Sequence, residues 1–263
     1  MTEAQRDRAR SIRHIYDLRS TIPYDPDSDS AYITDDVEIL SQFAPALSSR
    51  ILDVGCGLGW HLERLYKLGY TNLHGIDVSR SSLDAFQARI GSPARESITL
   101  ICDDLRSYRS EIPFDVVCSF LCCIGSFGDQ GDILFASAIR ALLKADACFV
   151  MTSFYREGVS DLVGEFKTAY AKNSEVILNT TSKFESLTNE MVFNQKITKT
   201  GDLNETIAVP EERIRLYTVE ELKAVFRRAG FSEVSCMPEC KLDERNRPVD
   251  RSAVLLTIAR HWG

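Results

Sequence analysis

The stretch "RILDVGCGLGWHLERL", residues 50–65, decides the fold because a strand, a tight turn and a helix follow one another within it. Residues 50–55 are a mostly apolar run of strand length. Three closely spaced glycines follow, and Leu58, Leu62 and Leu65 then recur at helical spacing. A strand that leads through a glycine-rich turn directly into a helix is typical of nucleotide-binding α/β domains.

The same alternation of strand and helix continues along the chain. Apolar runs predict four further strands, at 72–78, 98–104, 114–120 and 147–154. Helical spacing of apolar residues predicts helices over 57–68, 81–90 and 132–144. Nearly continuous apolar strands that alternate with helices indicate a parallel sheet covered on both faces. We therefore expect an α/β fold, a doubly wound, mostly parallel seven-stranded sheet of the Rossmann-like type, completed by two strands near the end of the chain.

The pattern changes after residue 155. Residues 176–217 are rich in threonine, alternate polar with apolar side chains and contain the turn sequence "TGD", which predicts antiparallel strands. The α/β pattern resumes at "TVEELKAVFRRAGF", where Thr218 and Glu221 form a capping box at the start of a helix. An antiparallel β insertion thus interrupts the α/β domain after its fifth strand.

These changes of pattern predict three parts. Residues 1–48 form an N-terminal helical cap segment, residues 49–155 and 214–263 form the Rossmann-like domain, and residues 156–213 form the β-rich insertion. Ligands of such sheets bind beyond the carboxyl ends of the strands, and the insertion begins at that edge. We expect it to serve as a lid, an acceptor pocket or a dimer contact.

Composition limits the classes of partner. The 263 residues include 31 Lys and Arg against 38 Asp and Glu, and this net charge of −7 disfavours nucleic acid and anionic membranes. No apolar run reaches the roughly 18 to 20 residues of a membrane span, and the first residues lack the apolar core of a signal peptide. The eight cysteines fit no usual zinc spacing, so we expect reduced thiols and no metal. A cytoplasmic protein with a small-molecule partner is favoured.

The glycine-rich turn distinguishes between nucleotide ligands. Dinucleotide-binding turns need a third glycine at the position of Trp60. Asp53 precedes the turn, and its carboxylate would repel a pyrophosphate but suit a sulfonium or ammonium group. Asp77, at the end of the second strand, can accept hydrogen bonds from a ribose, and Asp103 or Asp104 can accept one from an adenine amino group. S-adenosyl-L-methionine, a positively charged nucleoside without phosphate, fits these positions.

These motifs resemble those of the class I S-adenosylmethionine-dependent methyltransferases. The segments "ILDVGCGLGWH", "HGIDVSRSSL", "CDDLRSY" and "FDVVCSFLCCIGSF" are similar to the first four motifs of that family. The segment "LYTVEELKAVFRRAGF" resembles the helix before its last two strands, so the resemblance extends over roughly residues 10–260. The N-terminal "IYD" and the insertion are similar to small-molecule N-methyltransferases, particularly the amino-sugar N,N-dimethyltransferases.

The resemblance implies S-adenosyl-L-methionine as the cofactor and a set of contacts to it. The expected cofactor-binding residues are Tyr16, Asp53, Gly55, Cys56, Gly57, Gly59, Asp77, Val78, Asp104, Leu105 and Phe120. The amino-sugar enzymes hold a His or a similar polar ring after the Ile-Gly step, whereas this chain has Ser126. We therefore expect a different acceptor or a different base.

The expected reaction needs little acid or base chemistry. A sulfonium methyl is already activated, so transfer requires mainly a nucleophile held in line at about 3 to 3.5 Å. The candidate catalytic residues are Tyr32, Ser126 and His61, and the candidate for binding an anionic group of the substrate is Arg215. Each also has a purely structural interpretation. The two rings can be packing residues, the serine can end a strand, and the arginine can form a surface ion pair with a glutamate such as Glu211 or Glu212.

Three functions are compatible with these features. The favoured one is a methyltransferase that acts on a nitrogen or oxygen of a small molecule, with a homodimer formed through the insertion. A methyltransferase for RNA or protein is disfavoured by the acidic charge and the lack of a basic aromatic patch. A regulator or scaffold that binds the cofactor without transferring methyl is the third, because no recognisable base replaces the missing ring.

Overall fold

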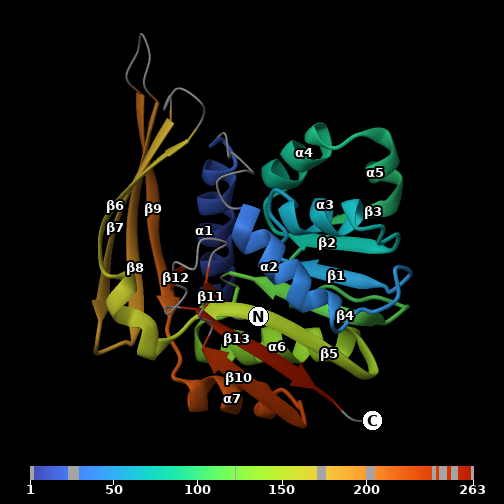
Figure 1. The fold of residues 1–263 in the computed structure, drawn as a ribbon. Helices are drawn as coiled ribbons and strands as arrows, with labels where there is room; N and C mark the ends of the chain where they lie inside the picture. Colours follow the sequence, from blue (N-terminus) through green and yellow to red (C-terminus); the bar gives the residue numbers. More distant parts are fainter. Residues whose placement is uncertain are drawn as a thin grey trace.

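The structure is a computed structural model, and it describes residues 3–22, 30–121, 123–170, 176–199, 205–238, 241–242, 248–249 and 254–261. Within these parts, a seven-stranded sheet flanked by helices lies beside a separate four-stranded sheet (Figure 1). The large sheet has the order β10-β13-β5-β4-β1-β2-β3. Its strands are β1 (Ile51–Val54), β2 (Leu73–Asp77), β3 (Ile98–Cys102), β4 (Phe114–Phe120), β5 (Leu143–Phe154), β10 (Glu233–Pro238) and β13 (Val254–Arg260).

Strands β1 to β5 run parallel to one another, whereas β13 runs antiparallel to both β5 and β10. This order confirms the predicted doubly wound, mostly parallel seven-stranded sheet. The strand predicted over 114–120 has those bounds in the structure, and the other predicted strands of this sheet differ by a few residues at their ends.

Helices cover both faces of the large sheet (Figure 1). One hydrophobic cluster joins the sheet to α2, α3, α4 and α5, and a second joins it to α6 and α7. Neighbouring residues of β1 divide between them, with Ile51 in the first cluster and Leu52 in the second, because successive strand side chains point to opposite faces. The bounds are α2 (Ser30–Ser41), α3 (Trp60–Lys67), α4 (Arg80–Arg89), α5 (Ser92–Ser97), α6 (Gly128–Leu142) and α7 (Val219–Arg228).

The capping box predicted for α7 is present. The Thr218 hydroxyl accepts a hydrogen bond from the Glu221 amide at 3.2 Å, and the Glu221 carboxylate accepts one from the Thr218 amide at 2.9 Å. The box fixes the point at which the chain returns from the insertion to the α/β domain.

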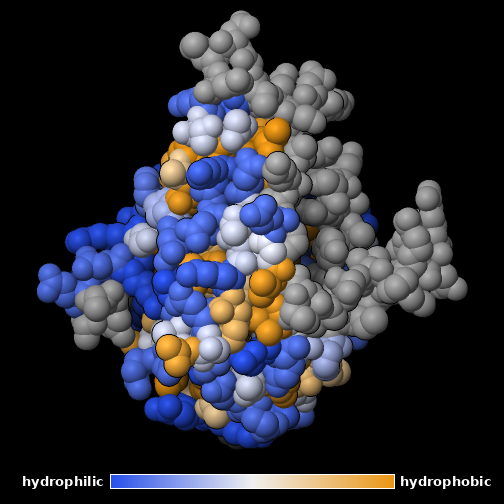
Figure 2. Space-filling model, turned by 90° about the vertical axis from the view of Figure 1, so that its left-hand side faces the viewer, coloured by the Kyte–Doolittle hydropathy of each residue, from blue (hydrophilic) through white to orange (hydrophobic). Residues whose placement is uncertain are grey.

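The insertion forms its own antiparallel sheet in the order β6-β7-β8-β9, preceded by a short 3-10 helix, η1. Hydrophilic side chains on this side of the molecule surround smaller hydrophobic patches (Figure 2). A further strand pair, β11 and β12, lies near the end of the chain. The bounds are η1 (Arg156–Leu162), β6 (Gly164–Tyr170), β7 (Val176–Glu185), β8 (Glu190–Lys199), β9 (Glu205–Arg215), β11 (Lys241–Leu242) and β12 (Pro248–Val249).

Helix α1 (Glu3–Arg19) lies between the two sheets (Figure 1). On one side, Ile15 packs in a cluster with Leu178 and Ile197 of the insertion. On the other side, the Asp17 carboxylate accepts hydrogen bonds from Ser79 at 2.6 Å and from Ser81 at 2.7 Å, at the start of α4. This helix therefore joins the insertion to the α/β domain.

Three further expectations concern the chain as a whole. The described cysteines are free thiols, namely Cys56, Cys102, Cys118, Cys123, Cys148 and Cys236, while Cys122 and Cys240 lie outside the described residues. In the described parts of the chain, no group of three or more His, Cys, Asp or Glu side chains is arranged to hold a metal. None of the described helices is both long and apolar enough to cross a bilayer.

Candidate active site

The turn after β1 is built from glycines in the left-handed region. Gly55, Gly57 and Gly59 have φ angles of 72°, 49° and 72°, which residues with a Cβ rarely adopt. A Cβ on Gly55 would lie 2.5 Å from the sulfur of Cys123, and one on Gly59 would lie 2.2 Å from the Phe86 ring. The glycines therefore permit both the backbone path and the close packing around it.

Asp77 ends β2 and faces this turn. Its carboxylate accepts one hydrogen bond from the Gly57 amide at 2.8 Å and another from the Ser79 amide at 2.8 Å. Burial raises the pKa of Asp77 even though both bonds oppose the rise. The carboxylate is thus held in place by backbone groups, and each oxygen has a further lone pair for a ligand.

Two acidic residues follow β3 and have different surroundings. Asp104 binds the guanidinium of Arg106 through both carboxylate oxygens, at 2.9 and 2.6 Å. Burial alone would raise the pKa of Asp104, but the bonds from Arg106 outweigh it and the pKa is lowered. Asp103 is exposed, and its carboxylate accepts the Asp104 amide at 2.7 Å.

Asp53 lies on β1 beneath the turn and is 2% exposed. One carboxylate oxygen accepts a weak bond from the Cys118 thiol at 3.9 Å, and the other has no hydrogen-bond partner among the described residues. Burial raises the pKa of this carboxyl to about 6. This carboxylate places negative charge beneath the turn, but it does not line the pocket described below.

The loop after β4 forms a second and mostly apolar wall. Leu121 has a φ of 51°, and its amide donates to the Thr152 carbonyl at 3.1 Å. Cys123 packs under Gly55, and burial raises its pKa to about 12, so the side chain is a neutral thiol at pH 7. Ser126 and Phe127 complete this wall.

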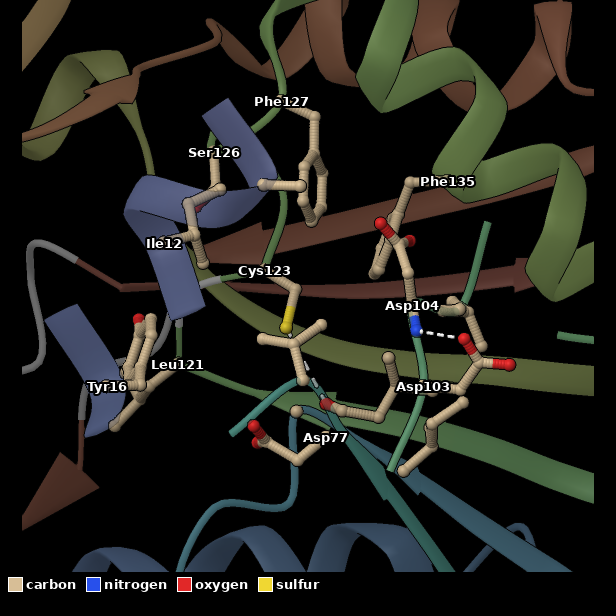
Figure 3. Close-up of a pocket in the computed structure, with 16 residues that line it drawn as sticks. Ile12, Tyr16, Asp77, Asp103, Asp104, Leu121, Cys123, Ser126, Phe127 and Phe135 are labelled. Atoms are coloured by element: carbon tan, nitrogen blue, oxygen red, sulfur yellow. Dashed lines mark hydrogen bonds between the residues drawn. The ribbon is translucent and has the colours of Figure 1, made fainter. Parts of the chain in front are cut away.

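These elements enclose one pocket (Figure 3). Asp77, Asp103 and Asp104 lie along one side of it, Ile12, Ser126 and Phe127 lie on the opposite side, and the Cys123 sulfur lies between them. Helix α1 supplies part of the wall with three residues. The lining residues are Ala9, Ile12, Tyr16, Val54, Gly55, Ile76, Asp77, Val78, Asp103, Asp104, Leu105, Leu121, Cys123, Ser126, Phe127 and Phe135.

Many of the predicted site residues meet at this pocket. The predicted cofactor contacts that line it are Tyr16, Gly55, Asp77, Val78, Asp104 and Leu105. The remaining predicted cofactor contacts, Asp53, Cys56, Gly57, Gly59 and Phe120, are not among the lining residues. Gly57 nevertheless binds the carboxylate of Asp77 directly, at 2.8 Å. The lining residues of α1 other than Tyr16 were not predicted, because the helix has no motif and only its tertiary position brings it here.

Of the candidate catalytic residues whose side chains are described, one lines the pocket and one does not. Ser126 lines the pocket. His61 instead binds the buried carboxylate of Asp36 at 3.1 Å and stacks on the Phe120 ring with 4.6 Å between ring centres. Tyr32 belongs to α2, and the structure describes its backbone but not its side chain. Ser126 is thus the candidate that the described structure places at the pocket.

Arg215 is already engaged by other groups of the protein. Its guanidinium lies 2.9 Å from the Glu221 carboxylate and 3.4 Å from that of Asp129, and it donates to the Leu216 carbonyl at 2.6 Å. An ion pair at Arg215 is therefore present, but its partners differ from the expected Glu211 or Glu212, because Glu211 binds Arg213 instead. A role for Arg215 in binding a substrate anion stays a prediction.

The residues present fit S-adenosyl-L-methionine. Asp77 presents a fixed carboxylate for a ribose, and Asp104 with Leu105 lies where an adenine is expected. Asp53 does not line the pocket, but its buried carboxylate beneath the turn adds negative charge that favours a cation there. The third glycine that a dinucleotide-binding turn needs is replaced by Trp60, the first residue of α3.

Comparisons with known proteins agree with this fit. Residues 51–146 match the family model described as a methyltransferase domain. A search of curated proteins finds no match.

Solved structures with the same fold cover nearly the whole chain. An S-adenosylmethionine-dependent methyltransferase from Clostridium acetobutylicum is 17% identical with a TM-score of 0.68, covering 95% of this chain and 97% of that one. The sugar N-methyltransferase KedS8 from Streptoalloteichus sp. is 16% identical with a TM-score of 0.65, covering 87% and 86%. The amino pentose methyltransferase CalS10 from Micromonospora echinaspora, solved with S-adenosylmethionine bound, is 18% identical with a TM-score of 0.62, covering 90% and 98%. The resemblance found in the sequence is confirmed, and the chain has the fold of these enzymes.

Proposed function

We propose that this chain, whose residues 51–146 form a methyltransferase domain, transfers a methyl group from S-adenosyl-L-methionine to an amine nitrogen of a small molecule. The observation that carries the proposal is the pocket itself. It joins an acidic wall at the carboxyl ends of β1, β2 and β3 to an apolar wall formed by α1 and the loop after β4.

The acidic wall would hold the cofactor. Asp77 would accept hydrogen bonds from the ribose hydroxyls, and the Asp104 region would bind the adenine. Asp53, buried beneath the turn, would favour the positively charged end of the molecule through its negative charge and without direct contact. When bound, S-adenosyl-L-methionine supplies a sulfonium methyl group that is already activated for displacement.

The apolar wall would hold and orient the acceptor. Ile12, Leu121 and Phe127 offer no charge to an incoming group. Because a low-dielectric environment disfavours an ammonium ion, such a wall favours the neutral, nucleophilic form of an amine. Orientation in line with the methyl group then provides most of the rate enhancement, and water or a weak base suffices for the released proton.

The substrate class that we favour is an amino sugar or a similar small amine. KedS8 and CalS10 are named as a sugar and an amino pentose methyltransferase, and we infer an acceptor of that kind for the pocket wall that α1 and the β4 loop form here. In this proposal Ser126 contacts the acceptor, Tyr32 and His61 remain candidate catalytic residues, and an oxygen acceptor is the second possibility.

Two experiments test the proposal. Calorimetry with S-adenosylhomocysteine is expected to show binding, with NADH as the comparison ligand. A transfer assay with methyl-labelled S-adenosyl-L-methionine would then screen amino sugars, other amines and phenols against a sample without acceptor. Labelled product from an amine supports the proposal. Binding without transfer to any class would support a regulator or scaffold, and saturation by NADH alone would exclude the methyltransferase function.

We also infer that the insertion is the contact surface of a homodimer. Its side of the molecule carries large exposed apolar residues, with Val163 48% exposed and Leu187 99% exposed. Light scattering is expected to give twice the mass of the 29.6 kDa chain, and Leu187→Ser is expected to shift the population toward monomer. The cytoplasmic location expected from the sequence stays a prediction.

A further inference from the structure

A buried carboxylate lies behind the loop that carries Ser126. Asp132 is on α6, is fully buried, and does not line the pocket. One of its oxygens accepts a hydrogen bond from the Gly125 amide at 3.0 Å and another from the Phe127 amide at 3.3 Å. The two amides flank Ser126, so one carboxylate oxygen binds the backbone on both sides of the residue that faces the pocket.

The second oxygen of Asp132 fixes the direction of the carboxylate. It accepts the Tyr217 hydroxyl at 2.8 Å. Tyr217 is 4% exposed and belongs to the segment between β9 and α7, so its position is set by the main core and not by the loop. Without this bond the carboxylate could rotate and release the two amides.

The loop is also held from its outer side. The Arg215 amide donates to the Gly125 carbonyl at 2.9 Å, and the Arg8 guanidinium donates to the Ser126 carbonyl at 2.6 Å. Gly125 has a φ of 88°, and a Cβ there would lie 2.3 Å from the Arg215 carbonyl oxygen. The backbone at residues 125–127 is therefore held by polar groups from α1, α6 and the end of β9.

We propose that Asp132, oriented by Tyr217, is a positioning residue. It holds the loop at residues 125–127 opposite the acidic wall of the pocket and so controls the alignment of the acceptor. The proposal rests on the methyl-transfer function proposed above. A buried ionised carboxylate is costly, and apolar residues of similar size would often stabilise a fold equally well. Its retention on α6 is explained by the two loop amides, which only an acceptor can bind.

The proposal also accounts for the neighbouring Phe127. The Arg106 guanidinium lies 4.2 Å from the centre of the Phe127 ring, and the same guanidinium binds Asp104. The loop held by Asp132 therefore touches the group that fixes the adenine side of the pocket. Displacement of the loop would therefore change the distance and orientation between the two walls. It would change the binding contacts within each wall less.

The experiment compares four variants. Asp132→Ala removes the acceptor for both amides, Asp132→Asn keeps one acceptor oxygen, and Tyr217→Phe removes only the orienting hydroxyl. Asp129→Asn is the matched control, because Asp129 also contacts the Tyr217 hydroxyl, at 3.2 Å, but is exposed on the same helix. Each variant is measured for kcat, for KM of the acceptor and for binding of S-adenosylhomocysteine.

We expect Asp132→Ala to lower kcat about 100-fold while affinity for S-adenosylhomocysteine changes less than about threefold. Asp132→Asn is expected to recover activity to within about fivefold of the wild type, and Tyr217→Phe to lie between the two. Any one of three results would overturn the proposal. They are equal losses in kcat and in affinity for S-adenosylhomocysteine, no recovery of activity in Asp132→Asn, and wild-type kcat in Asp132→Ala.

Hydrogen exchange of the amides of Gly125 and Phe127 separates this test from the proposed function. Their protection is expected to fall in Asp132→Ala and to persist in Asp132→Asn, whether or not the chain transfers a methyl group. If the wild type binds no S-adenosylhomocysteine, the proposed function fails, and the exchange data still report whether Asp132 holds the loop. Unchanged protection in Asp132→Ala, measured on folded protein, would show that it does not.

Discussion

The two walls of the pocket are built in different ways. The acidic wall, which we propose binds the cofactor and call the cofactor wall, comes from consecutive strand ends within residues 51–105, and its main polar contacts link neighbouring motifs, as Gly57 does with Asp77. The apolar wall, which we propose binds the acceptor and call the acceptor wall, combines α1, the β4 loop and their supports after β9 and on α6, with contacts such as Arg8 to Ser126 and Tyr217 to Asp132. The first wall thus depends on local sequence motifs, and the second depends on how distant segments pack.

This difference predicts where substitutions act. Changes in the cofactor wall should affect folding and cofactor affinity, whereas changes in the supports of the acceptor wall should affect acceptor use while cofactor binding persists. Four predictions test this separation.

The largest effect is expected from Gly59→Ala. Alanine at this position would have to adopt a left-handed backbone conformation, and its Cβ would lie 2.2 Å from the Phe86 ring. The strain and the clash together are expected to lower the free energy of unfolding by about 2 to 5 kcal/mol. Gly57→Ala is the matched control, because its φ is also positive but no atom lies within 4 Å of the new Cβ, so about 1 to 2 kcal/mol is expected. Denaturant unfolding measures both. Equal losses in the two variants would show that packing against Phe86 contributes nothing.

The second prediction concerns cofactor affinity. Asp77→Ala is expected to weaken binding of S-adenosylhomocysteine about 100-fold, equivalent to about 2.7 kcal/mol, since charge-assisted bonds to the ribose are lost and the Gly57 amide loses its acceptor. Calorimetry measures the change. Asp84→Ala, at an exposed position of α4, is the control and should bind as the wild type does. Wild-type affinity in Asp77→Ala would remove this residue from the cofactor wall.

The third prediction addresses the support of the acceptor wall. Glu212 is buried and binds Arg19 at 2.5 Å and the Tyr16 hydroxyl at 3.4 Å, so it fixes α1 against the insertion. Glu212→Gln keeps an acceptor oxygen but removes the charge, and KM for the acceptor is expected to rise about tenfold while affinity for S-adenosylhomocysteine changes less than about threefold. Glu211→Gln, at the exposed neighbouring residue, is the control. A loss of cofactor affinity equal to the rise in KM would mean that α1 serves both walls alike.

The smallest effect is a pH dependence of stability. The pKa of Asp53 is raised by burial to about 6, so the folded state favours the protonated carboxyl. Preferential protonation of Asp53 in the folded state therefore adds to the free energy of unfolding at low pH, and this contribution is lost as the pH rises through about 6. Between pH 7 and pH 5 the wild type is expected to gain about 1 kcal/mol relative to Asp53→Asn, measured by denaturant unfolding. An identical pH dependence in both proteins would contradict the raised pKa.

The sequence by itself determined the α/β sheet, the insertion and most of the cofactor wall. The strand over 114–120, the capping box at Thr218 and the position of Asp77 at the end of β2 could be predicted, because each depends on side-chain periodicity or on a motif of a few residues. Asp77 ends a strand and Asp104 follows one, and both strands were predicted from the sequence.

Only the tertiary structure decided the acceptor wall. It brought Ile12 of α1 to the pocket, engaged Arg215 with two carboxylates, paired His61, which does not line the pocket, with Asp36, and placed Asp132 behind Ser126. The physical reason is that these contacts join residues far apart in the chain. They arise from packing between two sheets and a helix, for which no periodicity and no local spacing carries a signal.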